Sequence, residues 1–266
     1  MAVRIAAHTF LFQQYGFDQV RQTDKIADTI AEAGYDAIEW HHTALVGDDY
    51  KNRLQLAQRN SGLELVGVSQ SLPLWNQGDY ERIVDILDDH AERLSLFDQE
   101  LTSTISCSGK GSANRNDAQN KHLITFWTEI SSLFDSLDQK VTYQNNGDTL
   151  GDLDNLTDNL EEDVLALSPN LHALHSAGIE PISYLQKHGD LIGSIHIRDY
   201  HIEGGRTIIL GEGDLPFDRL KTTLDEIDFD GDIIVDLILP SGTPPDTPIL
   251  DILKDSRKTI SDQLGY

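Results

Sequence analysis

Short apolar runs rich in β-branched and aromatic residues alternate along the chain with longer segments whose apolar residues recur every three or four positions. The short runs have the length and composition of buried strands, and the longer segments have the period of amphipathic helices. Regular alternation of the two is typical of an α/β protein with a parallel sheet. The predicted strands cover residues 5–10, 35–40, 63–68, 101–107, 141–146, 165–170, 195–199 and 233–236.

Helical periodicity occupies most of the sequence between these strands. In the first predicted helix, Ile26, Ile30 and Ala33 lie at helical spacing, and Gly34 follows as a left-handed cap. The predicted helices cover residues 20–33, 50–60, 79–97, 122–137, 153–163, 181–188, 217–227 and 249–264, with a polar loop over 109–120.

The length of the chain indicates a single domain. Its 266 residues are close to the ~250 typical of one (β/α)8 barrel. No linker rich in Pro, Gly or Ser divides the sequence, so the domain is expected to span residues 1–266. Eight strand–helix units close naturally into a single TIM barrel, although a doubly wound open sheet fits the same alternation.

Acidic residues dominate the charge of the protein. Asp and Glu number 45 against 20 Lys and Arg, which gives a formal net charge of −25. Nucleic acid and anionic membranes bind basic patches, so we expect neither as a partner. Aspartate exceeds glutamate and lysine is scarce, a composition that resembles proteins of salt-accumulating halophilic archaea.

The sequence also predicts a cytoplasmic location. It has no apolar run of transmembrane length, and its first residues run into a strand without the apolar core of a signal peptide. Its single cysteine, Cys107, excludes an intramolecular disulfide and is expected to be a buried structural thiol. The oligomeric state stays open, a homo-oligomer included.

Polar side chains gather at the ends of four predicted strands. In a parallel barrel the carboxyl ends of the strands carry the active site, so we expect these side chains to converge. They are Gln144, Asn145 and Asn146 after one strand, Asn170 after the next, His196, Arg198 and Asp199 in the third, and Asp236 in the last.

Five segments resemble motifs of the xylose isomerase-like TIM barrels, a superfamily of sugar-phosphate isomerases and epimerases, inosose dehydratase and endonuclease IV. AEAGYDAIE at 31–39 resembles the family unit "aeaGydgIE", and IHIRD at 195–199 resembles "vHlKD". LGEGDLPF at 210–217 resembles "lGeGdipf", and the segments 177–181 and 224–236 resemble two further units. The resemblance keeps the family's order over nearly the whole chain. It implies one barrel that takes a small sugar or polyol.

The resemblance also implies a metal site. In the family, an acidic residue, an Asp, a His and a final Glu hold a divalent metal. These four positions fall on Gln144, Asn170, His196 and Asp236, so two of the ligands are amides here. Because Mn²⁺, Mg²⁺ and Zn²⁺ favour carboxylate or imidazole ligands, we expect weak metal binding or none. No nucleotide cofactor is expected.

Catalysis is expected from His196 and Asp236, with Glu39 as an accessory polar group at the end of its strand. Arg198 is expected either to neutralise a phosphate or carboxylate of the substrate or to form a structural ion pair.

Three more residues are expected to contact the substrate. Trp75 can either stack on a sugar face or cap the barrel, and Asn146 and His172 lie near the predicted strand ends. His172 and His175, three residues apart, are also candidates to replace the missing acidic ligands.

The leading functional hypothesis is a sugar or sugar-phosphate isomerase or epimerase with a degenerate metal site. One alternative is a non-catalytic carbohydrate-binding or polyol-binding barrel, which the loss of ligand charge favours. Another is a lyase like inosose dehydratase, whose "YhnH" strand resembles Tyr143-Gln144-Asn145-Asn146.

The acidic composition predicts a strong response to salt. If the charge is a halophilic adaptation, the melting temperature should rise from low salt to molar KCl, because the Debye length falls to ~3 Å at 1 M and screens self-repulsion. A thermal-melting series against KCl at fixed pH measures this. A flat curve would instead identify an ordinary acidic enzyme.

Overall fold

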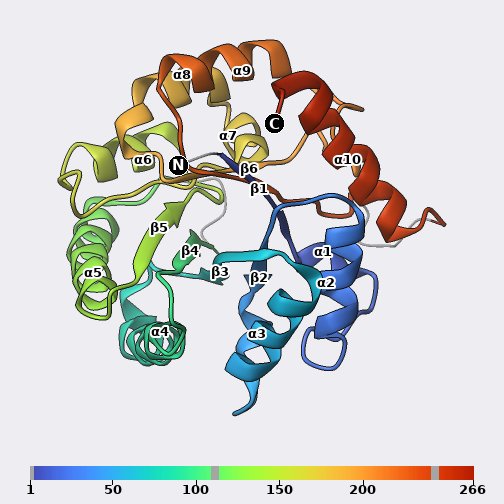
Figure 1. Cartoon of the computed structure of the whole chain (residues 1–266). Coiled ribbons are helices and arrows are strands. Elements are labelled where there is room, and N and C mark those ends of the chain that lie inside the picture. Colours follow the sequence, from blue (N-terminus) through green and yellow to red (C-terminus); the bar gives the residue numbers. More distant parts are fainter. Residues whose placement is uncertain (1–2, 109–113, 241–245) are drawn as a thin grey trace.

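The protein, described by a computed structural model over residues 3–108, 114–240 and 246–266, has its strands in the middle and its helices around them (Figure 1). The last helix, α10 (Ile249–Leu264), packs against α2 (Thr23–Glu32), which closes the outer ring of helices. The strands are β1 (Arg4–His8), β2 (Ala37–His41), β3 (Glu64–Leu72), β4 (Thr102–Cys107), β5 (Lys140–Gln144), β6 (Ser194–Ile197) and β7 (Asp232–Val235).

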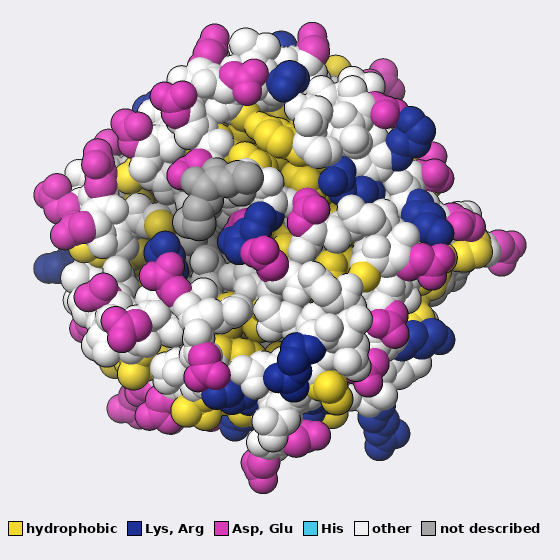
Figure 2. All heavy atoms as spheres, in the orientation of Figure 1, with side chains coloured by type: hydrophobic (Ala, Val, Ile, Leu, Met, Phe, Trp, Pro, Cys, Tyr) yellow, Lys and Arg dark blue, Asp and Glu magenta, His cyan; other side chains and the backbone are white. Residues whose placement is uncertain are grey.

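The helices follow the strands in turn. They are α1 (Phe10–Gln14), α2 (Thr23–Glu32), α3 (Tyr50–Ser61), α4 (Tyr80–Ser95), α5 (Asp117–Ser136), α6 (Leu150–Thr157), α7 (Leu171–Ser176), α8 (Pro181–Lys187), α9 (Phe217–Glu226) and α10 (Ile249–Leu264), with short 3₁₀ turns at His42–Leu45, Gln77–Asp79 and Gly189–Leu191. Within the described residues, no helix is long and apolar enough to cross a membrane. Figure 2 shows Asp and Glu side chains spread around the face it draws, with fewer Lys and Arg side chains among them.

All seven strands are parallel and pair in the order β5-β4-β3-β2-β1-β7-β6. Residues 165–170 join the two outer strands. Leu167 bridges Tyr143 on one side and Ile192 on the other, and Asn170 bridges His196. The predicted barrel is therefore confirmed. Its sixth predicted strand makes only isolated bridges, in keeping with Pro169, which has no N–H to donate to a ladder.

Several predicted boundaries are wrong. The helix expected from 122 begins at Asp117, because the Asn116 side chain accepts a hydrogen bond from Gln119 N and caps it. The polar loop therefore ends earlier than expected, and its residues 109–113 lie outside the described ranges. The helix expected over 153–163 spans Leu150–Thr157, where the Thr149 cap sets its start. The short helices α1 and α7 were not expected from periodicity.

The interior of the barrel is apolar in one layer and polar in the next. Ala6, Ala37 and Ile234 belong to a small buried cluster inside the sheet, with Val66. Because side chains alternate along a strand, the residues two positions further on face the same interior. Those residues are His8, Glu39 and Asp236. The strand register thus places the layer of ionisable side chains directly above the apolar layer.

Asp199 anchors the loop that follows β6. Its carboxylate is fully buried and accepts hydrogen bonds of 2.8–3.0 Å from the backbone N–H groups of Tyr200, Gly211, Gly213 and Leu215. A side chain on Gly213 would place its Cβ only 2.4 Å from Asp199 Oδ1. The LGEGDLPF segment therefore wraps around one carboxylate, and only glycine fits beside it.

We predict that Asp199→Asn destabilises the protein by roughly 2–4 kcal/mol, because the amide cannot accept all four N–H groups and buried donors lose their partners. Thermal and urea unfolding measure the loss. Asp214→Asn is the matched control, since Asp214 is 47% exposed at its side chain and accepts one backbone N–H, from Ile202. Equal losses in both variants would contradict the anchoring role.

Candidate active site

The carboxylate of Asp236 lies at the centre of a buried polar cluster at the carboxyl end of the barrel. Its Oδ2 accepts hydrogen bonds from Arg198 Nη2 and from Asn170 Nδ2, the latter at 3.0 Å. Its Oδ1 lies 3.2 Å from His8 Nδ1. Arg198 Nε also donates to the backbone oxygen of Asp236 at 2.9 Å. Both carboxylate oxygens are therefore engaged.

Charge pairing decides the ionisation of this cluster. Burial alone would raise the pKa of Asp236, but the Arg198 guanidinium and the hydrogen bond from His8 hold it well below its ordinary value. Burial disfavours protonation of His8, yet Asp236 and Glu39 raise its pKa above the usual value. Asp236 therefore stays ionised at neutral pH.

Glu39 is the one carboxylate of the cluster with a free oxygen. It lies on β2 with 1% of its surface exposed, and its Oε1 accepts a 2.7 Å hydrogen bond from Thr104 Oγ1. Its Oε2 has no hydrogen-bond partner in the described structure, although His196 Nε2 lies 3.6 Å away and His8 Nε2 3.9 Å away. Buried polar atoms are normally satisfied, so this oxygen is an exception within the described structure.

His196 lies on β6, and neither of its ring nitrogens has a hydrogen-bond partner among the described residues. Nδ1 is 3.9 Å from Asp236 Oδ2, too far for a hydrogen bond. The ring, 1% exposed, thus stands between the free oxygen of Glu39 and the occupied carboxylate of Asp236. Both of its ring nitrogens therefore keep their hydrogen-bonding capacity among the described residues.

These contacts do not suit a divalent metal. Asn170 turns its amide N–H toward Asp236, and its Oδ1 accepts from Ala173 N as the cap of α7. Arg198 directs a positive charge at the oxygen that a metal would need. Among the described residues, no group of three or more His, Cys, Asp and Glu side chains is arranged to hold an ion. The donor set fits a guanidinium better than a hard cation.

The structure brings together five of the predicted site residues, namely Glu39, Asn170, His196, Arg198 and Asp236. Gln144, at the end of β5, is half-buried, and in the described structure its side chain makes no hydrogen bond to this cluster. Asn146 is exposed and donates to Ser106 Oγ at 3.1 Å.

Trp75 and the two histidines of α7 lie outside the cluster. The Trp75 ring donates from Nε1 to Ser108 O at 2.9 Å. His175 stacks on Tyr200 with the ring centroids 4.0 Å apart, in an outer groove. Burial and the charges of Arg198 and Arg206 lower the pKa of His172 to about 4. Within the described residues, neither histidine belongs to a group of three or more side chains that could hold a metal ion.

Sequence reasoning overlooked His8, Ser69, Thr104 and the role of Asn145. His8 ends β1, so the rule that selected the other strand ends also applies to it. It is held between Asp236 and Ser69 Oγ, which lies 2.6 Å from His8 Nε2. The Asn145 side chain accepts from Asn170 N at 2.8 Å and donates to Asn170 O at 3.3 Å. That pairing had no sequence signal.

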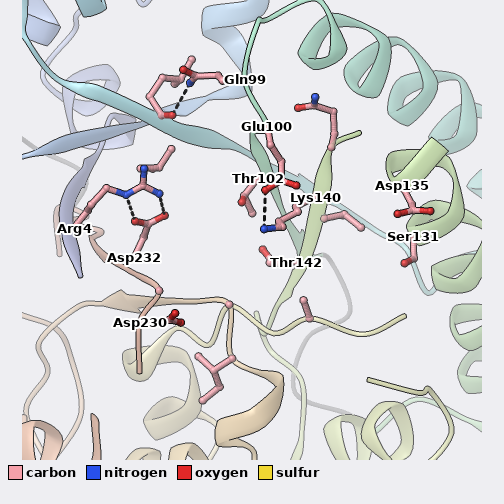
Figure 3. Close-up of a pocket in the computed structure, with 18 of the residues that line it drawn as sticks. Arg4, Gln99, Glu100, Thr102, Ser131, Asp135, Lys140, Thr142, Asp230 and Asp232 are labelled. Carbon is pink, nitrogen blue, oxygen red and sulfur yellow. Dashed lines mark hydrogen bonds and ion pairs between the residues drawn. The ribbon is translucent and has the colours of Figure 1, made fainter. Parts of the chain in front are cut away.

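A cavity of about 900 Å³ opens at the opposite, amino-terminal end of the barrel (Figure 3). Arg4 pairs there with Asp232 at 2.7 Å and with Glu64 at 2.9 Å. Lys140 pairs with Glu100 at 2.7 Å. Arg4 and Lys140, in the lining of this cavity, are thus paired with carboxylates. In TIM barrels the amino-terminal end is typically important for stability.

Comparison with known protein families shows which family the chain belongs to. The model of the xylose isomerase-like TIM barrel matches residues 27–259. The chain belongs to this family. A search of curated proteins found no significant match.

Solved structures share the fold at low identity. L-ribulose 3-epimerase is 16% identical with a TM-score of 0.80, over 100% of this chain and 95% of the other. A probable 3-DHS dehydratase from Bacillus anthracis is 18% identical with a TM-score of 0.78, over 98% and 99%. D-allulose 3-epimerase from Methylomonas sp., in complex with D-allulose, is 14% identical with a TM-score of 0.75, over 98% and 97%. Such identities establish the fold alone.

The occupied Asp236 predicts how metal binding can be restored. We expect no stoichiometric binding of Mn²⁺ to the unmodified protein by calorimetry. Gln144→Glu with Asn170→Asp adds two carboxylates, but Arg198 still holds Asp236. Adding Arg198→Met should therefore tighten binding on the order of tenfold or more, because affinity follows ligand charge.

The control for this experiment combines Gln144→Glu and Asn170→Asp with Arg59→Met, which removes an exposed arginine on α3. If that control binds Mn²⁺ as tightly as the Arg198→Met combination, Arg198 does not compete with metal. Tight binding to the unmodified protein would contradict the whole reading.

Proposed function

We propose that the protein isomerises a small polyhydroxylated carbonyl compound, a sugar or sugar phosphate, by moving a proton next to the carbonyl without a divalent metal. The observation that carries the proposal is the free Oε2 of Glu39, buried beside two imidazole rings. A carboxylate in that position can accept a proton from carbon, and a neighbouring imidazole can exchange one with oxygen. Family membership and epimerase neighbours support the substrate class.

The proposed step conserves atoms and charge. Glu39 takes the proton from the carbon next to the carbonyl, and the electron pair of that C–H bond moves to give an enediolate. His196 delivers a proton to the former carbonyl oxygen and receives one from the neighbouring hydroxyl. Glu39 then returns its proton to the former carbonyl carbon, which completes an aldose–ketose interconversion.

Asp236 limits the chemistry to one carboxylate base. Epimerisation at a carbon needs a proton donor on the face opposite the base, and a second free carboxylate would supply it. Both oxygens of Asp236 are taken by Arg198, Asn170 and His8. The proposal therefore favours isomerisation, in which one base can remove and return the proton on one face, over two-base epimerisation.

Arg198 stabilises this arrangement through its hydrogen bonds to Asp236. It donates to Asp236 through both Nε and Nη2, which keeps Asp236 ionised and available to orient His8. In this role Arg198 is a positioning residue, and Asp236 acts through His8. Of the two roles expected for Arg198 from the sequence, the proposal uses the structural ion pair, which Arg198 forms with Asp236.

We predict that Glu39→Gln lowers the rate of proton exchange by roughly 10²–10⁴-fold, because an amide cannot act as the base. Protein in D₂O is incubated with a panel of aldoses, ketoses and their phosphates, and deuterium at the carbon next to the carbonyl is measured by NMR. Glu64→Gln, 62% exposed at the opposite end of the barrel, is the control. Undiminished exchange in Glu39→Gln would refute the proposal.

The same experiment separates the alternatives. A dehydratase would release water and give a product that absorbs in the ultraviolet as a conjugated carbonyl. A non-catalytic barrel would bind members of the panel, detected by calorimetry, without exchange in the unmodified protein. Either result would replace the isomerase.

A further inference from the structure

Arg206 lies beside the candidate active site, and its guanidinium is only partly satisfied by hydrogen bonds. It follows β6 on a hairpin in which it pairs with Tyr200, and its Nη2 donates to Leu239 O at 3.2 Å. Tyr200 is two residues beyond Arg198, and Leu239 is three residues beyond Asp236. The Nε of Arg206 is buried and has no hydrogen-bond partner among the described residues.

This arginine has no carboxylate partner in a very acidic chain. Within the described ranges, every other buried or half-buried arginine has a carboxylate oxygen within 4 Å, whereas Arg206 has none. The paired ones are Arg4, Arg53, Arg93, Arg115, Arg198 and Arg257. The ranges left undescribed, 1–2, 109–113 and 241–245, contain no Asp or Glu.

The charged neighbours of Arg206 are Arg198, already neutralised by Asp236, and Asp236 itself. Burial and the Arg198 charge lower the pKa of Arg206 below its usual value. A partly buried guanidinium without a counter-ion in contact is unfavourable, and an anion that binds beside it offsets that cost. The arrangement leaves one uncompensated positive charge next to the proton-transfer groups.

We propose that Arg206 is a specificity-determining residue that binds an anionic oxygen group of the substrate, a phosphate or a carboxylate. That the bound anion belongs to the substrate rests on the proposed function, whereas the anion site itself does not. The free Nε–H belongs to the planar fork with which arginine binds such groups through two hydrogen bonds. Because Arg198 is held by Asp236, Arg206 takes the role of neutralising the substrate.

The test measures binding rather than turnover. Calorimetry compares neutral ketoses, the same ketoses as phosphates, the corresponding sugar acids, and inorganic phosphate, each with the unmodified protein and with Arg206→Met. We expect at least one class of anion to bind about 10- to 100-fold tighter than its neutral counterpart. Arg206→Met should remove that advantage and leave neutral ketoses unchanged. The phosphate and sugar-acid arms identify which anion is bound.

Arg59→Met is the matched control, because Arg59 is an exposed arginine on α3 that also lacks a carboxylate within 4 Å in the described structure. Arg206→Lys keeps the charge without the fork and should retain part of the preference, provided that both variants melt near the unmodified protein. Equal binding of anionic and neutral ligands, an equal loss in Arg59→Met, or no binding of any anion would overturn the proposal. Anion binding without proton exchange would refute the isomerase alone.

Discussion

The structure of the site depends on how one buried carboxylate is neutralised. The Asp236 carboxylate is hydrogen-bonded by Arg198, Asn170 and His8. Arg198 follows β6, Asn170 belongs to the segment 165–170 that joins the outer strands, and His8 ends β1. Removing one partner of such a buried pair costs roughly 3–5 kcal/mol, because the other charge stays buried and unpaired. The same contacts therefore close the seam of the barrel and decide which groups are left for chemistry.

The two ends of the barrel differ in how completely their polar groups are satisfied. At the amino-terminal end Arg4 and Asp232 form two hydrogen bonds of 2.7 and 2.9 Å across β1 and β7. At the carboxyl end Glu39 and His196 keep three buried polar atoms without hydrogen-bond partners among the residues that the structure describes. Natural proteins break local rules where function requires it, so this asymmetry supports the proposal that the chemistry takes place at the carboxyl end.

The sequence predicted the fold well, because alternation of strands and helices depends on short-range patterns. It also placed His196 and Asp236 at strand ends that meet. It could not predict that the Asn170 side chain would turn its amide toward Asp236, since that orientation depends on the cap of α7 and on Arg198. His8 was overlooked because its strand carried no family motif. Its role depends on Ser69 and Asp236, which are distant in sequence.

The amide at position 170 and the arginine at position 198 are best understood together. With Asp at 170, two carboxylates would face each other in a buried space, and one guanidinium could not neutralise both. A divalent cation would then be the natural counter-ion. With Asn170, a single negative charge remains on Asp236, and a single guanidinium balances it while the amide donates an additional hydrogen bond. The loss of acidic ligands and the buried arginine are therefore one electrostatic solution. That solution leaves Glu39 Oε2 and Arg206 Nε as buried atoms without a hydrogen-bond partner among the described residues, and both proposals start from these two atoms.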